Sequence, residues 1–264
     1  MTGGSSNPDS GPRGRMRSVG SSPSEIGTPD LDAWARMAGA GYLIIIVAGI
    51  FAEFFVRSSL IQPGDPGGTA QAIAAAEGFF RTGVAAELVM LVADVAVAGA
   101  LYVVLRGVDS GLALLAAFFR LAHAAVVGVN LLATYLPLIL IGPVGESSGL
   151  GPEALDGLVL LALELHGYGY TVGLVFFGVH CLLLGHLVRR SRMFPPVLGV
   201  LLMIAGAGYL VDGFAQTLLV DYPAYEGVFL MVVFLPAFVG EVSFCLWLLA
   251  RGVSGTGRRE AAPA

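Results

Sequence analysis

GYLIIIVAGIFAEFF (residues 41–55) is apolar without interruption up to Glu53, and similar runs recur along the chain as far as residue 250. Runs of about 20 apolar residues are long enough to cross a hydrocarbon core about 30 Å thick. A strand of a membrane barrel would alternate between apolar and polar side chains. The run therefore predicts a helix, in which every backbone amide can be paired inside the lipid.

The composition agrees with a chain that lies mostly in a membrane. Hydrophobic residues make up 56% of the sequence and charged residues 12%, whereas soluble domains are about one quarter charged. The mean hydropathy is +0.82. The net charge of −5 offers no basic surface for nucleic acid, so no nucleic-acid partner is expected.

Six apolar runs, separated by Gly-, Pro- and Arg-containing breakers, predict an all-α bundle of six transmembrane helices. The predicted spans are 37–56, 82–105, 111–136, 158–188, 197–219 and 227–250. Residues 1–36 have few large apolar side chains and are expected to form a disordered cytoplasmic arm. Residues 251–264 are expected to form a short cytoplasmic tail.

The distribution of arginine predicts the orientation. With the N-terminus inside, the inner segments hold eleven Arg and the outer segments only Arg57 and Arg81. Positive residues accumulate on the cytoplasmic side of membrane proteins. Both termini are therefore expected to be cytoplasmic in a multi-pass protein of a bacterial inner membrane.

Several polar side chains fall inside the predicted spans, where ionisable groups are costly and commonly functional. Positions seven residues apart share one face of a helix, so Glu87 is expected beside Asp94, and His123 beside Asn130. The predicted ligand-binding residues are Glu87, Asp94, Arg120, His123, Asn130, Glu164, His166 and Asp212.

Arg120 is the one arginine expected deep inside a span, and a buried guanidinium needs an acid. Asp94 is the first candidate because it is expected at a similar depth on the neighbouring span, and Glu241 is the second. About four acids are then left without a permanent cation. They can carry a proton, pair with His123 or His166, or face water or a bound cation.

Most of the remaining polar residues are expected in the outer half of the bundle, which suggests a polar cavity there. The alternative is a hydrogen-bonded network that only holds the helices together. HGYGYTVG (166–173) is similarly ambiguous. Its glycines indicate close helix packing, or else a locally opened helix whose carbonyls line a cavity.

Metal or haem binding is not expected, because His166 and His180 would lie about 21 Å apart along one helix at 1.5 Å per residue. Cys181 and Cys245 both fall in spans and are expected to be small buried side chains rather than a disulfide. The sequence has no HExxH, CxxC, P-loop or GxSxG motif, so nothing predicts a cofactor or a soluble-type catalytic site.

Three segments taken together resemble the bacterial membrane family called domain of unknown function 4386. They are GYLIIIVAGIFAEFFVRSSLIQPGD (41–65), LALLAAFFRLAHAAVVGVNLL (112–132) and HGYGYTVGLVFFGVHCLLLGHLVRRSRMFPPVLGVLLMIAGAGYLVDGF (166–214). The likeness extends over nearly all of 37–250. The resemblance implies an integral membrane protein of about this size, and it implies no activity.

The hypothesis that follows is a non-enzymatic membrane protein whose outer-half cavity binds or transports a small polar or cationic species. Glu87, Asp94, Glu164, His166 and Asp212 would line that cavity. One alternative is a membrane enzyme or redox protein that uses His123 and His166. Another is a scaffold or sensor whose arm, residues 1–36, binds a cytoplasmic partner. The lipid bilayer is an expected partner in each case, and the sequence predicts no oligomeric state.

Overall fold

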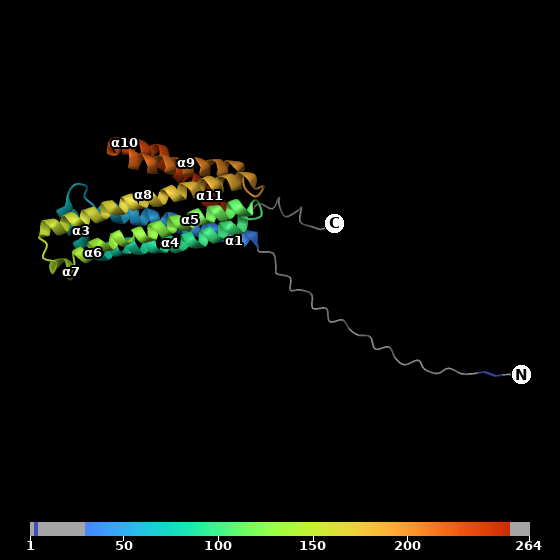
Figure 1. Ribbon diagram of the computed structural model, residues 1–264, viewed down its shortest axis with the longest axis horizontal. Helices are drawn as coiled ribbons and strands as arrows, with labels where there is room; N and C mark the ends of the chain where they lie inside the picture. The colour runs from blue at the N-terminus through green and yellow to red at the C-terminus, as the bar shows by residue number, and fades with distance from the viewer. Residues whose placement is uncertain (1–2, 5–29, 254–264) are drawn as a thin grey trace.

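Figure 1 shows the computed structural model of the chain, which describes residues 3–4 and 30–253. Every regular element in these ranges is a helix. Six helices are long and apolar enough to cross a membrane. The first comprises α1 (Leu31–Ile50), η1 (Phe51–Arg57) and α2 (Ser58–Leu60), and the second is α4 (Glu77–Leu105). The third comprises α5 (Ser110–Asn130) and α6 (Leu132–Leu140), and the fourth is α8 (Pro152–Arg190). The fifth is α9 (Pro196–Leu218), and the sixth comprises η2 (Leu230–Phe234) and α11 (Leu235–Arg251).

The six helices form a closed ring in which each packs on the next. Contacts run from α1 to α4, from α4 to α5, from α5 to α8, from α8 to α9, from α9 to α11, and from α11 back to α1. The predicted bundle of six apolar helices is therefore present. The first four helices are longer than the predicted spans, the fifth has the predicted length, and the first begins at Leu31 rather than at residue 37. Residues 1–2 and 5–29 of the predicted arm lie outside the described residues.

The beginning of the first helix lies beside the end of the last helix, as expected for an even number of spans. Arg36 donates to the carbonyl of Leu249 at 3.0 Å, and the Val253 amide donates to Asp32 at 3.3 Å. We call this the inner end of the bundle, following the predicted orientation. The opposite, outer end carries the short helices α3 (Pro66–Ala75), α7 (Pro143–Glu146) and α10 (Tyr222–Phe229) (Figure 1).

Helix α8 is the longest helix of the described residues and runs the length of the bundle (Figure 1). Its 39 residues correspond to about 58 Å at 1.5 Å per residue, about twice the thickness of a hydrocarbon core. Helices α3 and α6 also pack against it. HGYGYTVG (166–173) is part of this continuous helix, so of the two interpretations the structure supports close packing.

Helices α8 and α9 make their close contact through glycines. A Cβ atom added to Gly206 of α9 would lie 2.6 Å from the Gly178 carbonyl oxygen, and one added to Gly178 would lie 2.9 Å from that of Gly206. Gly185 of α8 and Gly199 of α9 face each other in the same way, about two helical turns closer to the inner end. Small residues allow such backbone approach between membrane helices, where dispersion contacts rather than hydrophobic exclusion hold the pair together.

Candidate functional site

A cavity of about 560 Å³, which we call the outer cavity, lies inside the ring towards its outer end. Helices α1, α4, α8, α9 and α11, together with η1 and η2, supply its walls. Most of the wall is aliphatic or aromatic. The polar side chains that line it are Glu53, Arg57, Glu87, His166, Tyr170, Tyr209 and Glu241. A mostly apolar cavity with a few polar groups is the usual form of a small-molecule site.

Arg57 joins two acids at the outer part of this cavity. Its Nε donates to Glu53 at 2.7 Å, and its Nη1 contacts the carboxylate of Glu87. Glu53 is four residues before Arg57, so η1 brings both to one side, whereas Glu87 comes from α4. The sequence placed Arg57 in an outer loop and left Glu87 without a permanent cation. That expectation was wrong. The first helix continues to Leu60, so Arg57 lies on a helix, and its guanidinium forms an ion pair with Glu87.

His166 approaches Glu87 from the opposite side of the cavity. The Asn130 amide donates to His166 Nδ1 at 3.1 Å and to the His166 carbonyl at 2.8 Å. Since Nδ1 accepts, the proton of a neutral ring belongs on Nε2. Nε2 lies 3.5 Å from Glu87 Oε1. Asn130 thus fixes both the orientation and the tautomer of the histidine that faces the acid.

Glu87 keeps one free oxygen. Its side chain is 1% exposed, and Oε2 has no hydrogen-bond partner among the described residues. Leaving a buried acceptor of this kind unsatisfied costs roughly 1–3 kcal/mol, and more when it is charged. Because Glu87 is also one of the residues that line the outer cavity, an acid with unused hydrogen-bonding capacity lies beside that space.

Glu241 is a second acid in the wall, contributed by α11. The Tyr209 hydroxyl donates to it at 2.5 Å from α9. Among the described residues no Arg or His nitrogen lies within ion-pair distance of Glu241. Three carboxylates thus face this cavity together with one guanidinium, so the polar part of the wall favours positive charge.

Arg120 and Asp94 form a separate cluster that is buried within the ring. Arg120 Nη2 lies 2.5 Å from Asp94 Oδ1, so the partner predicted from sequence is the one observed. Arg120 Nη1 donates to the Tyr42 hydroxyl at 2.9 Å and contacts His180 Nε2 at 3.2 Å. An arginine only donates, so His180 accepts through Nε2 and its Nδ1 donates to the Ala116 carbonyl at 2.9 Å.

His123 completes this cluster on the other side of the aspartate. Its Nε2 lies 3.6 Å from Asp94 Oδ2, and its Nδ1 is 2.9 Å from the Gly173 carbonyl. Asp94, Arg120 and His123 are each at most 5% exposed, and none lines the outer cavity. The structure therefore assigns these three predicted residues to a buried polar network rather than to the cavity wall.

Glu164 and Asp212 do not line the outer cavity, contrary to expectation. Glu164 is exposed on α8, because it lies two residues from His166 and so about 200° around the helix. Asp212 accepts from Tyr222 at 2.6 Å and from Gln216 at 3.1 Å in a cluster at the outer end of α9.

Of the seven polar residues of the wall, the predicted ligand-binding set includes Glu87 and His166 and misses Glu53, Arg57, Tyr170, Tyr209 and Glu241. The spacing of four between Glu53 and Arg57 could have indicated that both lie on one helix. The two tyrosines carry no such signal, since an intramembrane tyrosine is equally compatible with an interfacial anchor. Glu241 was recognised as a deep acid, but only as the second candidate partner for Arg120.

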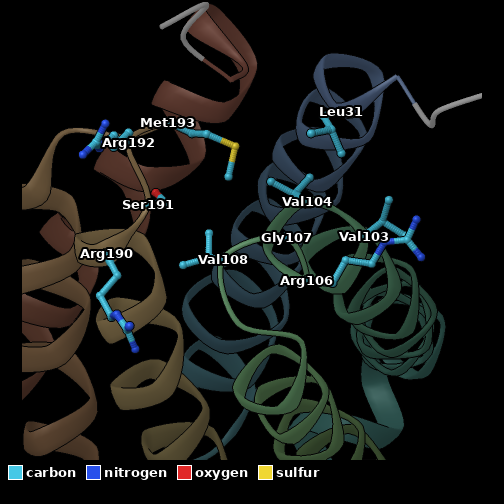
Figure 2. Close-up of a pocket in the computed structure, with 10 residues that line it drawn as sticks. All are labelled: Leu31, Val103, Val104, Arg106, Gly107, Val108, Arg190, Ser191, Arg192 and Met193. Carbon is cyan, nitrogen blue, oxygen red and sulfur yellow. The ribbon is translucent and has the colours of Figure 1, made fainter. Parts of the chain in front are cut away.

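A second hollow, of about 580 Å³, lies at the inner end between the α4–α5 connection and the segment after α8 (Figure 2). Its lining includes Arg106, Arg190 and Arg192. Figure 2 shows these three guanidinium groups pointing in different directions, whereas Val108 and Met193 reach towards the space between the segments. The arginines therefore do not converge on one ligand. Within the described residues no group of three or more His, Cys, Asp and Glu could hold a metal ion.

Comparison with known proteins gives the chain its relatives. An uncharacterized protein of Archaeoglobus fulgidus is 29% identical over 163 residues, which are 62% of this chain and 79% of that protein. No solved structure matches the chain. Residues 37–252 match the family described as Domain of unknown function (DUF4386), and because the match covers most of the chain, the protein belongs to that family.

Proposed function

We propose that this membrane protein binds an amphipathic cation in the outer cavity, with Glu87 and Glu241 as the groups that recognise the positive charge. The observation that carries the proposal is the unpartnered, buried Oε2 of Glu87, a residue that lines a cavity of about 560 Å³. A ligand ammonium or hydroxyl group would satisfy it. A charge-assisted hydrogen bond of this kind contributes about 1.5–3 kcal/mol.

The rest of the wall favours a ligand with an apolar part. Phe234, Phe238, Met90 and two consecutive isoleucines, Ile45 and Ile46, line the cavity. Burying one methylene group is worth about 0.8 kcal/mol. Aromatic faces also attract cations within about 6 Å of the ring centre. An alkyl or aryl chain that ends in an amine matches both parts of the wall.

Three ligands with one chain and different head groups test the proposal. Octylammonium, octanol and octanoate would each be titrated into the purified protein in a non-ionic detergent while the unfolding temperature is followed. The cation is expected to raise the unfolding temperature in a saturable way, because a ligand that binds only the folded state stabilises it. Octanoate is expected to have little effect. Equal shifts for the three head groups would contradict charge recognition.

Conservative variants locate the site. Glu87→Gln and Glu241→Gln are each expected to weaken octylammonium binding about 10-fold or more, since 1.4 kcal/mol corresponds to a factor of ten. Arg57 keeps Glu53 as its partner in the first variant, so the fold is expected to survive. Glu164→Gln is the matched control, because this residue is exposed and lies outside the outer cavity. Loss of binding in Glu164→Gln alone would place the site elsewhere.

A further inference from the structure

One side of the outer cavity is closed far less firmly than the others. Near the inner end α1 and α11 are in close contact: Cys245 Sγ lies 3.4 Å from the Gly39 carbonyl oxygen, and the rings of Tyr42 and Phe244 meet edge to face at 5.9 Å. Farther out the cavity is lined by α1 and η1 on one side and by η2 and α11 on the other. The two helices thus meet at the inner end and border the cavity beyond it.

An aromatic pair bridges the two sides of this opening. The ring centroids of Phe54 in η1 and Phe234 in η2 are 6.2 Å apart, and Phe238 stacks on Phe234 at 6.0 Å. All three line the cavity. The exposed fractions are 54% for Phe54 and 42% for Phe234. Exposed side chains thus border the cavity between η1 and η2, and Glu53, next to Phe54, is a further exposed residue of the lining.

Both backbone segments that carry this pair are π-helical. Within the described residues η1 and η2 are the two π-helices of the chain, and they lie on opposite sides of the same opening. The hydrogen bonds of a π-helix span one more residue than those of an α-helix, and such segments are rare and found frequently at functional sites. The presence of a π-helix on both sides of the opening distinguishes this side of the cavity, in addition to the aromatic pair.

The route from water is covered more firmly. An apolar cluster at the outer end joins η1, α2, α3, α4 and α8; its buried members include Leu60, Ile73 and Leu163. Leu163 also lines the outer cavity, and Ile61 both lines it and packs on the cluster. The cluster therefore adjoins the cavity on the side that faces the outer solution.

We propose that the outer cavity is filled from the surrounding lipid leaflet, through an opening between η1 and η2 that Phe54 and Phe234 close, and that its ligand is an amphiphilic cation dissolved in the membrane. This inference rests on the proposed function. In the predicted orientation the leaflet concerned is the outer one. An apolar chain would pass between the two rings while its charged head moves towards Glu241 and Glu87.

Cross-linking the opening tests the route. Phe54→Cys/Phe234→Cys protein would be linked with a reducible bis-methanethiosulfonate spacer, and octylammonium occupancy would be measured by native mass spectrometry. Cys181 and Cys245 are buried, at 0% and 1% exposed, so they need not be replaced. Protein linked before the ligand is added is expected to show at least a 10-fold lower occupancy than unlinked protein. Protein linked afterwards is expected to retain the ligand through dialysis until the spacer is reduced.

A single substitution tests the same route in case the double variant does not fold. Phe54→Cys treated with benzyl methanethiosulfonate is expected to bind octylammonium more slowly by a factor of about ten. Phe55→Cys treated in the same way is the control, because Phe55 is the adjacent residue, is 62% exposed and does not line the cavity. Equal slowing at both positions would indicate a general effect of the label and would overturn the inference.

The outcomes separate the two proposals. If octylammonium occupies linked and unlinked protein equally, the opening is not the route, while the proposed function stands. If the wild-type protein binds no octylammonium at all, the proposed function fails and the route fails with it.

Discussion

Arg120 has complementary groups at both of its Nη atoms, whereas its buried Nε has no hydrogen-bond partner among the described residues. Asp94 provides the counter-charge, Tyr42 and His180 accept hydrogen bonds, and the rings of Tyr42 and Phe177 lie 4.6 and 5.2 Å from the guanidinium carbon. A buried ion pair is not in itself a large source of stability, but the loss of one partner leaves an uncompensated charge. The cluster is therefore expected to matter for folding more than for ligand binding.

Arg120→Met is expected to destabilise the protein by about 3–5 kcal/mol, because Asp94 would remain buried without its counter-charge. Asp94→Leu/Arg120→Met removes both charges and is expected to be less destabilised than the single variant. Denaturant unfolding in detergent, followed by circular dichroism, measures both. If the loss of unfolding free energy in the double variant equals the sum of the losses in Arg120→Met and in Asp94→Leu, the two residues are not coupled.

The same reasoning changes which acids are suitable for testing ligand binding. From sequence alone, Glu87 and Asp94 are equally suitable, since both are predicted to line the cavity. Because Asp94 is ion-paired with Arg120, Asp94→Asn is expected to destabilise the bundle whatever it does to the ligand. Glu87 and Glu241 face the outer cavity and are the informative positions.

At the scale of the elements, the glycines of α8 and α9 decide how closely two of the six long helices approach. Gly178 and Gly185 face Gly206 and Gly199 across the interface. This contact holds α9 against α8 and so positions Tyr209 beside Glu241 in the cavity wall. The interface is thus connected to the site, although no glycine touches a ligand-binding group.

Gly206→Val is expected to destabilise the protein by about 1–3 kcal/mol, as overpacked interiors commonly do. The added side chain would meet the Gly178 carbonyl and the backbone of α8. Gly99→Val is the matched control, since nothing lies within 4 Å of a Cβ atom at that position of α4. Equal unfolding temperatures of the two variants would mean that the α8–α9 approach tolerates a larger side chain.

At the scale of the whole molecule, the arginines give the bundle a polarity. Arg36, Arg106, Arg190, Arg192 and Arg251 lie at the end where the first and last helices meet, whereas the outer end carries α3, α7 and α10. This distribution supports an orientation with the arginine-rich end in the cytoplasm. The orientation fixes which leaflet adjoins the opening between η1 and η2.

Cysteine labelling tests this orientation. The thiol of Ser147→Cys, in the exposed segment after α7, is expected to react with a membrane-impermeant maleimide in intact cells. The thiol of Gly107→Cys, in the exposed α4–α5 connection, is expected to react only after the cells are permeabilised. The reverse pattern would invert the bundle and place the opening in the inner leaflet.

The sequence was sufficient for the features that depend on composition and depth. The six helices follow from apolar length, and the Arg120–Asp94 pair follows from counting residues along two neighbouring spans. Features that depend on how a helix ends or rotates were not accessible. Arg57 reaches Glu87 because the first helix continues as η1. Glu164 is exposed because it lies about 200° around α8 from the buried His166.

The central claim is that the outer cavity selects a cation with an apolar chain. The most direct measurement is native mass spectrometry of the wild-type protein mixed with equal concentrations of octylammonium, octanol and octanoate. The account predicts one bound octylammonium per chain and a signal that falls about 10-fold in Glu241→Gln, in line with the loss of one charge-assisted contact. Preferential binding of octanoate, or an octylammonium signal that Glu241→Gln leaves unchanged, would contradict it.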